Sequence, residues 1–445
     1  MNKITVTTST EYPFHSGASI YLNDGSTATK LSFDINTYAR IRGKFDIDAG
    51  EFAYFCAVIY GCDRLISRNS NSSTSDRWTR EIAVKIPVRE PERWGACREV
   101  AERMLEFLTG DIWYLSFYAY DRSNLLFGEK FYNVRSKFRN KTRATGNAVS
   151  LFSGGLDSLV GVINWLEENP TQSLMLASSY DAHAENANDD QKSLFPKLEK
   201  FYPQRVAKFV ARSGLLDKGQ DTNFRSRSLT FLGNAVLAAS FLGDGTKIII
   251  PENGAIALNY PLDPSRSGSF STRTVHPYFI DQFNLLLRTF GFNYTVENPY
   301  QFRTKGEVLR ECKNQEFLKR LYATSVSCGK RGRKMRWHDK YAKACGHCVP
   351  CIFRQAAVHV AGFAPENYGC TVSNNAEWGT SGLLKPNGDL QTVIDFVQSN
   401  SDKALIWRKL RSNGFLERKH KNDYIELVVR LKAELKDWLT DMDLL

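Results

Sequence analysis

The sequence lacks any uninterrupted apolar stretch that approaches the roughly eighteen residues needed to span a membrane. Its first residues, MNKITVTTSTEYPFHSG, also lack the apolar core of a secretory signal. No internal repeat is visible, which argues against a solenoid or a propeller. From these absences we expect a cytoplasmic protein that has no membrane partner.

Cysteine is sparse along most of the chain. Nine cysteines occur in 445 residues, and three of them fall within the seven letters CGHCVPC. In a cytosolic protein such clustering indicates a metal site rather than disulfides. The net charge of +11 suits a polyanionic partner or a phosphate-bearing substrate, although solvated lysines produce the same total.

The distribution of apolar residues predicts three regions. Residues 1–140 read as an α+β domain, with β-rich runs ITVTTS, GEFAYFCAVIYGC, REIAVKIPV and DIWYLSFYAY and a helical CREVAERMLEFL. Residues 145–375 alternate apolar strands with helical periods, which is typical of an α/β fold whose parallel sheet is covered on both faces. Residues 376–445 read as a helical extension, and we expect one face of it to pack in a core. That face contains Tyr424, Leu427, Val428, Leu431, Leu435 and Trp438.

The stretch AVSLFSGGLDSLVGVINWLEE predicts a strand, a glycine turn and a helix. Gly154 and Gly155 let the backbone turn sharply and approach phosphate oxygens, while Ser153 and Ser158 add hydroxyl donors. A carboxylate at Asp157 would repel a polyphosphate unless it holds Mg²⁺. No lysine follows the glycines, so the loop is not a Walker A sequence. The alternative is a simple glycine turn with a first-turn charge.

Four cysteines have the spacing of metal ligands: Cys328, Cys345, Cys348 and Cys351. Four thiolates satisfy tetrahedral Zn²⁺ and leave no open position, so the expected role is a structural clip. A four-cysteine iron–sulfur cluster fits the same spacing, and unmetallated buried thiols are the third alternative. The other five cysteines show no ligand spacing, and we expect them to be packing residues.

The motif SGGLDS resembles the SGGxDS signature of the PP-loop ATP pyrophosphatases. Together with the late cysteines it resembles the QueC-like group, the 7-cyano-7-deazaguanine synthases, in which SC is followed by CGxCxxCxxR. Here these elements are SC at 327–328 and CGHCVPCIFR at 345–354. The segments RSLTFLGNA, at 227–235, and NPYQFRTKGEVLREC, at 298–312, resemble two further segments of that group.

The resemblance implies an adenine-nucleotide α-hydrolase-like domain that uses ATP and Mg²⁺. Such an enzyme would adenylate a 7-deazaguanine carboxylate and let an amine displace AMP. The resemblance implies catalytic roles for Asp157, Lys305 and Arg227, the last two neutralising charge on the phosphates. It places the nucleotide at Ser153, Gly154, Gly155, Leu156, Asp157, Ser158, Ser179 and Tyr180.

Four residues are candidates to contact the substrate: His183, Asn253, Arg273 and His276. Arg273 and His276 could bind a carboxylate or act as acid and base, and each could equally serve the structure alone. The sequence departs from the synthases at YDAHAE, residues 180–185, which lacks their glutamine and arginine, and again at 251–280. The family's own contacts to the base are therefore not carried over.

The added N-terminal and C-terminal regions resemble those of larger QueC-like proteins from bacterial anti-phage operons, those of the Qat system in particular. An added domain suggests a macromolecular acceptor, so the amine could belong to a partner protein from the same operon. The basic segment GKRGRKMRWHDKYAK, with Trp337 and Tyr341, suits nucleic acid or an acidic protein, or is a solvated loop. The alternatives are a synthase of the queuosine precursor, a tRNA-modifying PP-loop enzyme and a non-catalytic nucleotide-binding scaffold.

Overall fold

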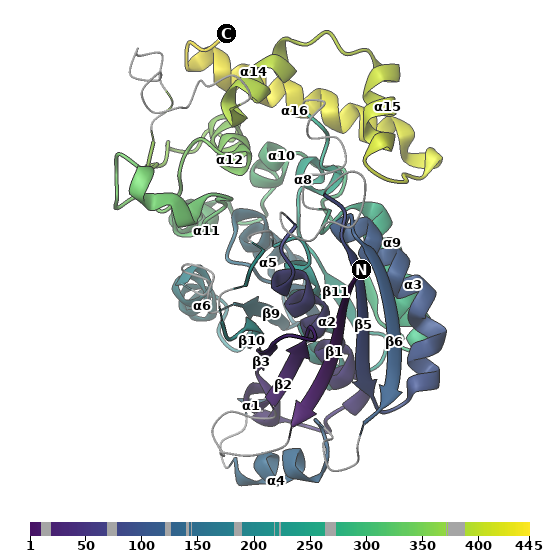
Figure 1. The fold of residues 1–445 in the computed structure, drawn as a ribbon. Helices are drawn as coiled ribbons and strands as arrows, with labels where there is room; N and C mark the ends of the chain where they lie inside the picture. Colours follow the sequence, from purple (N-terminus) through teal and green to yellow (C-terminus); the bar gives the residue numbers. More distant parts are fainter. Residues whose placement is uncertain are drawn as a thin grey trace.

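The computed structural model describes twelve stretches of the chain. They are residues 1–9, 19–68, 78–120, 126–138, 142–143, 145–181, 189–217, 219–221, 224–262, 273–370, 372 and 388–445. Within them the chain is an α/β protein built on one large sheet (Figure 1). No described helix combines the length and the apolar character required to cross a membrane.

The sheet has ten strands in the order β12-β11-β8-β9-β10-β3-β2-β1-β5-β6. In chain order the strands are β1 (Asn2–Ser9), β2 (Ser19–Asn23), β3 (Ala28–Phe33), β5 (Glu81–Val88), β6 (Ile112–Ala119), β8 (Ala148–Leu151), β9 (Leu174–Tyr180), β10 (Val206–Leu215), β11 (Lys247–Ile249) and β12 (Thr295–Glu297). A separate parallel pair joins β4 (Ile41–Arg42) to β7 (Thr142–Arg143). The predicted α/β class with a mainly parallel sheet is confirmed.

Two parallel blocks are joined through an antiparallel centre. One parallel block consists of β12, β11, β8, β9 and β10, and the other consists of β1, β5 and β6. Between them, β3 pairs antiparallel with both β2 and β10. The pairing of Ser32 with Gly214 thus continues the sheet from the N-terminal region into the region after residue 145. Hydrogen bonds from Tyr38 to Asn234 and from Tyr60 to Asp181 strengthen the same junction. The N-terminal region and the region after residue 145 therefore share one sheet, and both contribute residues to the core on one of its faces.

Helices cover both faces of the sheet. Val149 and Met175 belong to a core with α2 (Ile47–Leu65) and α7 (Arg227–Leu242). Ala148 and Leu176, one residue along each strand, belong to the opposite core with α5 (Leu156–Glu168) and α6 (Asp189–Phe201). This alternation reflects the period of two of a strand buried on both sides.

The prediction of a β-rich run at GEFAYFCAVIYGC was wrong, because this segment lies within helix α2. Every residue from Ala49 to Leu65 of that helix is buried. A helix that is apolar on all sides has no amphipathic period, and its aromatic and β-branched residues then favour a strand assignment. The helical prediction for CREVAERMLEFL is confirmed by α3 (Pro91–Thr109), which packs against α9 (Pro277–Phe290).

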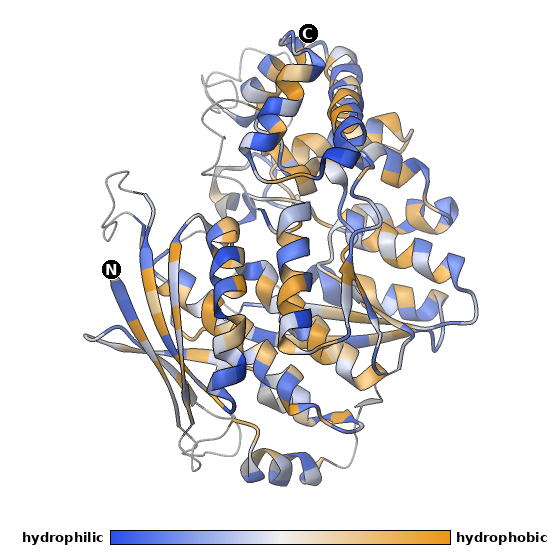
Figure 2. Ribbon diagram, turned by 90° about the vertical axis from the view of Figure 1, so that its right-hand side faces the viewer, coloured by the Kyte–Doolittle hydropathy of each residue, from blue (hydrophilic) through white to orange (hydrophobic). Residues whose placement is uncertain are grey.

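The C-terminal residues form a helical layer, as predicted, shown at the top of Figure 1. All six apolar residues of the predicted face are buried in its core, with exposed fractions no higher than 4%. Orange and blue alternate along these helices in Figure 2, as expected where one face is buried. The layer consists of α14 (Asp389–Gln398), α15 (Lys403–Ser412) and α16 (Lys421–Asp441), packed on α12 (Val349–Val360) and α8 (Gly254–Leu258).

The remaining short helices connect these layers. They are α1 (Ile35–Ala39), α4 (Glu129–Lys137), α10 (Lys305–Arg310) and α11 (Gln315–Leu321), together with the 3-10 turns η3 (Tyr322–Thr324), η4 (Arg331–Arg336) and η5 (Arg418–His420).

Candidate functional site

The loop between β8 and α5 has the geometry of an anion-binding turn. Gly154 has a φ of +83°, and a Cβ there would lie 2.8 Å from Cβ of Asp190, so only glycine fits. Gly155 is the N-cap of α5 and offers no capping side chain. Instead its own N–H donates to Ser153 Oγ at 3.2 Å, and Ser158 Oγ donates to the Gly155 carbonyl at 2.9 Å. The start of α5 therefore presents backbone N–H groups and two hydroxyls to one small space.

Asp157 and Lys305 form a buried ion pair beside this loop. The Lys305 ammonium donates to Asp157 Oδ2, and the side chains are only 4% and 8% exposed. Asn253 Nδ2 donates to the same oxygen at 3.3 Å, whereas Asp157 Oδ1 is buried without a partner in the described chain. The three residues follow β8, β11 and β12, which are parallel neighbours. Their meeting point is thus the carboxyl edge of the sheet, where ligands of open α/β sheets bind.

Glu252, which was not predicted from the sequence, is a second carboxyl group in this cluster. Asn253 Nδ2 also donates to Glu252 Oε1, at 3.2 Å, so one amide bridges Glu252 and Asp157. Burial, followed by the nearby Asp157 charge, raises the pKa of Glu252 well above its usual value. The raised pKa favours the neutral form of Glu252, so the Lys305 ammonium pairs with Asp157 alone while Glu252 lies beside this pair as a buried oxygen ligand. The sequence signal was available, because Glu252 lies just beyond an apolar strand in the segment PEN.

Ser179, Tyr180 and Arg227 lie at or after the carboxyl ends of the next two strands of the sheet, β9 and β10. Ser179 and Tyr180 end β9, and Arg227 begins α7 after β10. The Ser179 hydroxyl and the Arg227 Nε are buried without hydrogen-bond partners in the described chain. The Arg227 guanidinium lies 5.6 Å from the ring of Phe231, one turn along its helix. Unpaired polar groups of this kind are costly unless a ligand satisfies them.

The other substrate candidates are not gathered at the Asp157 cluster. His183 lies outside the described residues. Arg273 donates to the Phe107 carbonyl at 3.0 Å and stacks on the Phe107 ring at 4.8 Å. His276 is fully buried, and its Nδ1 accepts the Tyr278 N–H at 3.2 Å as the N-cap of α9. These contacts of Arg273 and His276 are made with α3 and α9 and are compatible with the structural alternative.

The four predicted ligand cysteines do converge. The Sγ atoms of Cys328, Cys345, Cys348 and Cys351 all lie within 4.8 Å of one another, and the sulfurs of Cys345 and Cys351 are 3.8 Å apart. A tetrahedron with Zn–S bonds of about 2.3 Å has edges of about 3.8 Å. These thiolates could therefore hold a single metal ion such as zinc. An iron–sulfur cluster would need the sulfurs farther apart, since several iron atoms would lie between them. The other five cysteines are buried and form no disulfide.

The cysteine site touches the anion-binding loop. Val326 N–H donates to the Gly154 carbonyl at 3.2 Å, and Leu156 N–H donates to Ser327 Oγ at 3.4 Å. The thiol of Cys351 in turn donates to the Ser327 carbonyl at 3.7 Å. Arg354, in the position expected from the family resemblance, forms a buried ion pair with Glu366 at 2.6 Å and donates to Ser327 Oγ at 3.5 Å.

The basic segment that follows Cys328 is only partly available to a partner, because some of its side chains are paired or buried within the chain. Lys330 and Arg331 form ion pairs with Asp389 and Asp190, at 2.5 and 2.6 Å. Trp337, expected as a contact residue, is instead 2% exposed and packs over Gly369. Met335 and Tyr341 stand open to solvent, at 91% and 96%. Tyr341 is the aromatic side chain of this segment that a partner can reach.

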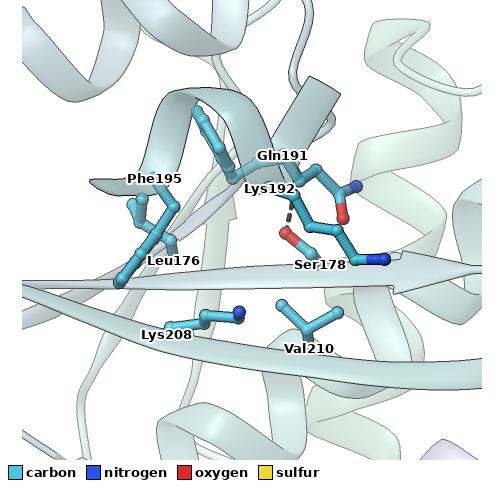
Figure 3. A pocket seen from close by; sticks show the side chains of 8 residues that line it. Leu176, Ser178, Gln191, Lys192, Phe195, Lys208 and Val210 are labelled. Carbon is cyan, nitrogen blue, oxygen red and sulfur yellow. Dashed lines mark hydrogen bonds between the residues drawn. The ribbon is translucent and has the colours of Figure 1, made fainter. Parts of the chain in front are cut away.

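Figure 3 shows a small cavity beneath α6. Gln191 lines it from α6, Ser178 from β9 and Lys208 from β10. Ser178 donates to the Phe152 carbonyl at 2.6 Å, and both polar atoms of the Gln191 amide are buried without partners. A volume of about 10 Å³ is close to the minimum for one water molecule, so a nucleotide cannot occupy this cavity.

The structure is that of an α/β protein with a glycine turn and a buried ion pair at its sheet edge and a neighbouring four-cysteine site that could hold a metal ion. Comparisons with protein-family models, with curated proteins and with solved structures found no match to this chain.

Proposed function

We propose that the chain is a PP-loop, QueC-like enzyme that converts ATP to AMP and pyrophosphate. It adenylates the carboxylate of a 7-deazaguanine and transfers the acyl group to an amine, in bacterial anti-phage defence. The observation that carries the proposal is the buried Asp157–Lys305 pair at the glycine turn that opens α5. Charged groups of both signs at such a turn suit a phosphate chain and its counterion together.

The glycine turn would hold the pyrophosphate part of ATP. The backbone N–H groups of Gly155 and Leu156 lie at the start of α5, where the helix dipole favours an anion; they now donate to the Ser153 and Ser327 hydroxyls, which a bound phosphate would replace as acceptors. The hydroxyls of Ser153 and Ser158 lie 3.3 Å apart at the same place. Gly154 keeps the space between the loop and α6 free of a side chain.

Lys305, Arg227 and Asp157 would supply the electrostatics of the reaction. The Lys305 and Arg227 cations would neutralise charge that moves from the α-phosphate to the departing pyrophosphate. Asp157, with Glu252 beside it, has the oxygen donors that Mg²⁺ prefers, and the ion when bound screens phosphate charge. The rate would come from alignment and charge stabilisation, without a covalent enzyme nucleophile.

The reaction balances in two steps. A carboxylate oxygen of the substrate bonds to the α-phosphorus of ATP while the bond to pyrophosphate breaks. The amine nitrogen then bonds to the activated carbonyl carbon, AMP leaves with the bridging oxygen, and the amine loses a proton. Ammonia would give an amide, whereas an amine on a partner protein from the same operon would give a protein conjugate.

Zn²⁺ would be a structural ion in this enzyme. Four thiolates fill a tetrahedral shell, so a bound Zn²⁺ would have no open position for catalysis. Its contribution is to hold residues 326–328 against the anion loop.

A pyrophosphate-release assay tests the proposal. Wild-type chain receives ATP and Mg²⁺ with and without 7-carboxy-7-deazaguanine, beside Asp157→Ala and a matched control, Glu168→Gln. Glu168 is an exposed carboxylate at the far end of α5. Release that needs both the deazaguanine and Asp157, and that survives in the control, supports the enzyme. ATP binding without release, even with ammonia and operon partners added, would favour a scaffold. Salt-dependent tRNA binding that stimulates release would favour a tRNA-modifying enzyme.

A further inference from the structure

Helix α16 contains a buried carboxylate, Glu434, on its apolar face. Glu434 is 8% exposed, and its neighbours on the same face, Leu431, Leu435 and Trp438, are apolar and buried. Burial raises the pKa of Glu434, since the charged form loses contact with water. A leucine would fill the same space at lower cost, so the carboxylate needs another explanation.

Both oxygens of Glu434 bind the start of α10. The Thr304 hydroxyl donates to Oε1, and the Gly306 N–H donates to Oε2 at 3.4 Å. Thr304 is the N-cap of α10 and forms a capping box with Glu307. Arg430, one turn earlier on α16, forms an ion pair with Glu307 at 2.7 Å. Helix α16 therefore holds the first turn of α10 at two points.

Lys305 lies between the two residues that Glu434 binds. It is the first residue of α10, it is 3% exposed, and its ammonium reaches Asp157. The direction of a side chain at a helix start follows from the backbone on either side of it. Fixing Thr304 and Gly306 therefore fixes the path of the Lys305 side chain toward the anion loop.

The contact between Glu434 and Gly306 is too close to admit a side chain at residue 306. A Cβ on Gly306 would lie 2.4 Å from Glu434 Oε1 and 2.5 Å from Cγ2 of Val360. The absence of a side chain at residue 306 is thus what lets the carboxylate reach the backbone of α10.

We infer that Glu434 is a positioning residue that aims Lys305 at the Asp157 cluster, which makes the C-terminal helix part of the catalytic machinery. The role in catalysis rests on the proposed function, because Lys305 acts on phosphates only if ATP binds there. The orientation of the Lys305 side chain is a property of the folded chain, and it can be measured without enzyme turnover.

The test compares the reactivity of the Lys305 amine in variants of the full chain. Glu434→Leu keeps the packing and removes both acceptors, and Glu434→Gln keeps one acceptor for Thr304. Glu426→Gln is the matched control, since Glu426 is an exposed carboxylate on the same helix and pairs with Lys403. A lysine-selective reductive methylation is followed at Lys305 by peptide mass spectrometry, and pyrophosphate release gives kcat and KM for ATP in parallel.

We expect Lys305 to be methylated roughly tenfold faster in Glu434→Leu than in wild type, because losing one or two hydrogen bonds corresponds to such a factor. The rate in Glu434→Gln should lie between these two, and the rate in the control should equal that of wild type. We expect kcat to fall in the same order. Equal Lys305 reactivity in Glu434→Leu and the control overturns the inference, whatever happens to the melting temperature. If Glu434→Leu does not fold, Glu434→Gln and Gly306→Ala decide by the same readout. If the wild type releases no pyrophosphate while the reactivity difference persists, the proposed function fails and the positioning of Lys305 stands.

Discussion

Ser327 accepts a hydrogen bond from the backbone N–H of Leu156, at 3.4 Å between Oγ and N. Leu156 is the first residue of α5, and Ser327 directly precedes the ligand candidate Cys328. Because the Cys351 thiol also binds the Ser327 carbonyl, the four-cysteine site and the anion loop share one short segment. We therefore expect a loss of order at the cysteines to disturb the loop.

Removal of a metal from the cysteines should weaken nucleotide binding. We expect elemental analysis to find one Zn²⁺ per chain. After chelation, or in Cys345→Ser, we expect ATP to bind about tenfold more weakly, because one lost positioning hydrogen bond costs about 1 to 1.5 kcal/mol. Calorimetric titration with a non-hydrolysable ATP analogue measures the affinity. Cys97→Ala, a buried thiol on α3, is the control. Unchanged affinity in a metal-free chain that is still folded would show that the loop needs no support from this site.

Replacing Lys305 alone should cost more stability than replacing both members of its ion pair. Lys305→Met leaves the Asp157 carboxylate buried beside Glu252 without its cation, which typically costs about 3 to 5 kcal/mol. In the double variant Lys305→Met with Asp157→Asn, much of this loss should return, because the uncompensated charge is gone. Urea unfolding of the four species in a double-mutant cycle measures the coupling. Strict additivity of the two changes would contradict a buried pair.

Gly154→Ala should destabilise the chain more than a matched glycine replacement. Gly245 also has a positive φ, +76°, but an added Cβ there meets no atom of the described residues within 4 Å. Gly245→Ala therefore measures the backbone cost alone, about 1 to 2 kcal/mol. At Gly154 the contact with Asp190 adds to this cost, by about 1 to 3 kcal/mol for overpacking. Thermal and urea unfolding check the difference, and equal losses would argue against the tight approach of α6 to the loop.

Acid should destabilise the chain through His276. Burial, with Arg273 nearby, lowers the pKa of His276 to about 3, so the folded state keeps it neutral while the unfolded state protonates below its usual value near 6.5. The unfolded state then binds more protons, and stability falls as the pH falls from about 6.5 toward 3. At pH 5 the loss is about 2 kcal/mol.

The variant His276→Asn tests this origin of the acid sensitivity. Asparagine also caps helices, so α9 keeps its first turn while the titrating group is gone. We expect a shallower loss of unfolding free energy between pH 6.5 and pH 5 than in wild type, measured by urea titration. An identical slope in the two proteins would assign the acid sensitivity to other groups.

Part of the candidate site was visible in the sequence because its determinants are local. The glycine turn of SGGLDS depends on adjacent residues, and the buried face of α16 depends on a helical period. Most of the cysteine cluster was predictable, because the C-x-x-C-x-x-C spacing brings Cys345, Cys348 and Cys351 together locally, and only Cys328 arrives from farther along the chain. These features were found at the predicted positions.

Other parts of the site depend on contacts between distant residues, which the spacing of residues in the sequence does not reveal. Glu252 was missed although it neighbours Asn253, because a lone acid after a strand has many uses. His276 lies in a polar, chemically suggestive segment, yet its imidazole caps α9 and is sealed by Phe107. Helix α2 was read as a strand because burial on all sides removes the periodic signal.

By itself, the sequence determined the glycine turn, the convergence of the four cysteines and the alternation of strands and helices after residue 145. Only the tertiary structure decided that β3 pairs with β10, so that one sheet runs through both regions, and that Lys305 meets Asp157 under the control of α16. Turns, helical faces and close ligand pairs depend on neighbours in the chain. Strand pairing and buried ion pairs depend on a balance of burial, hydrogen bonding and chain entropy over the whole fold.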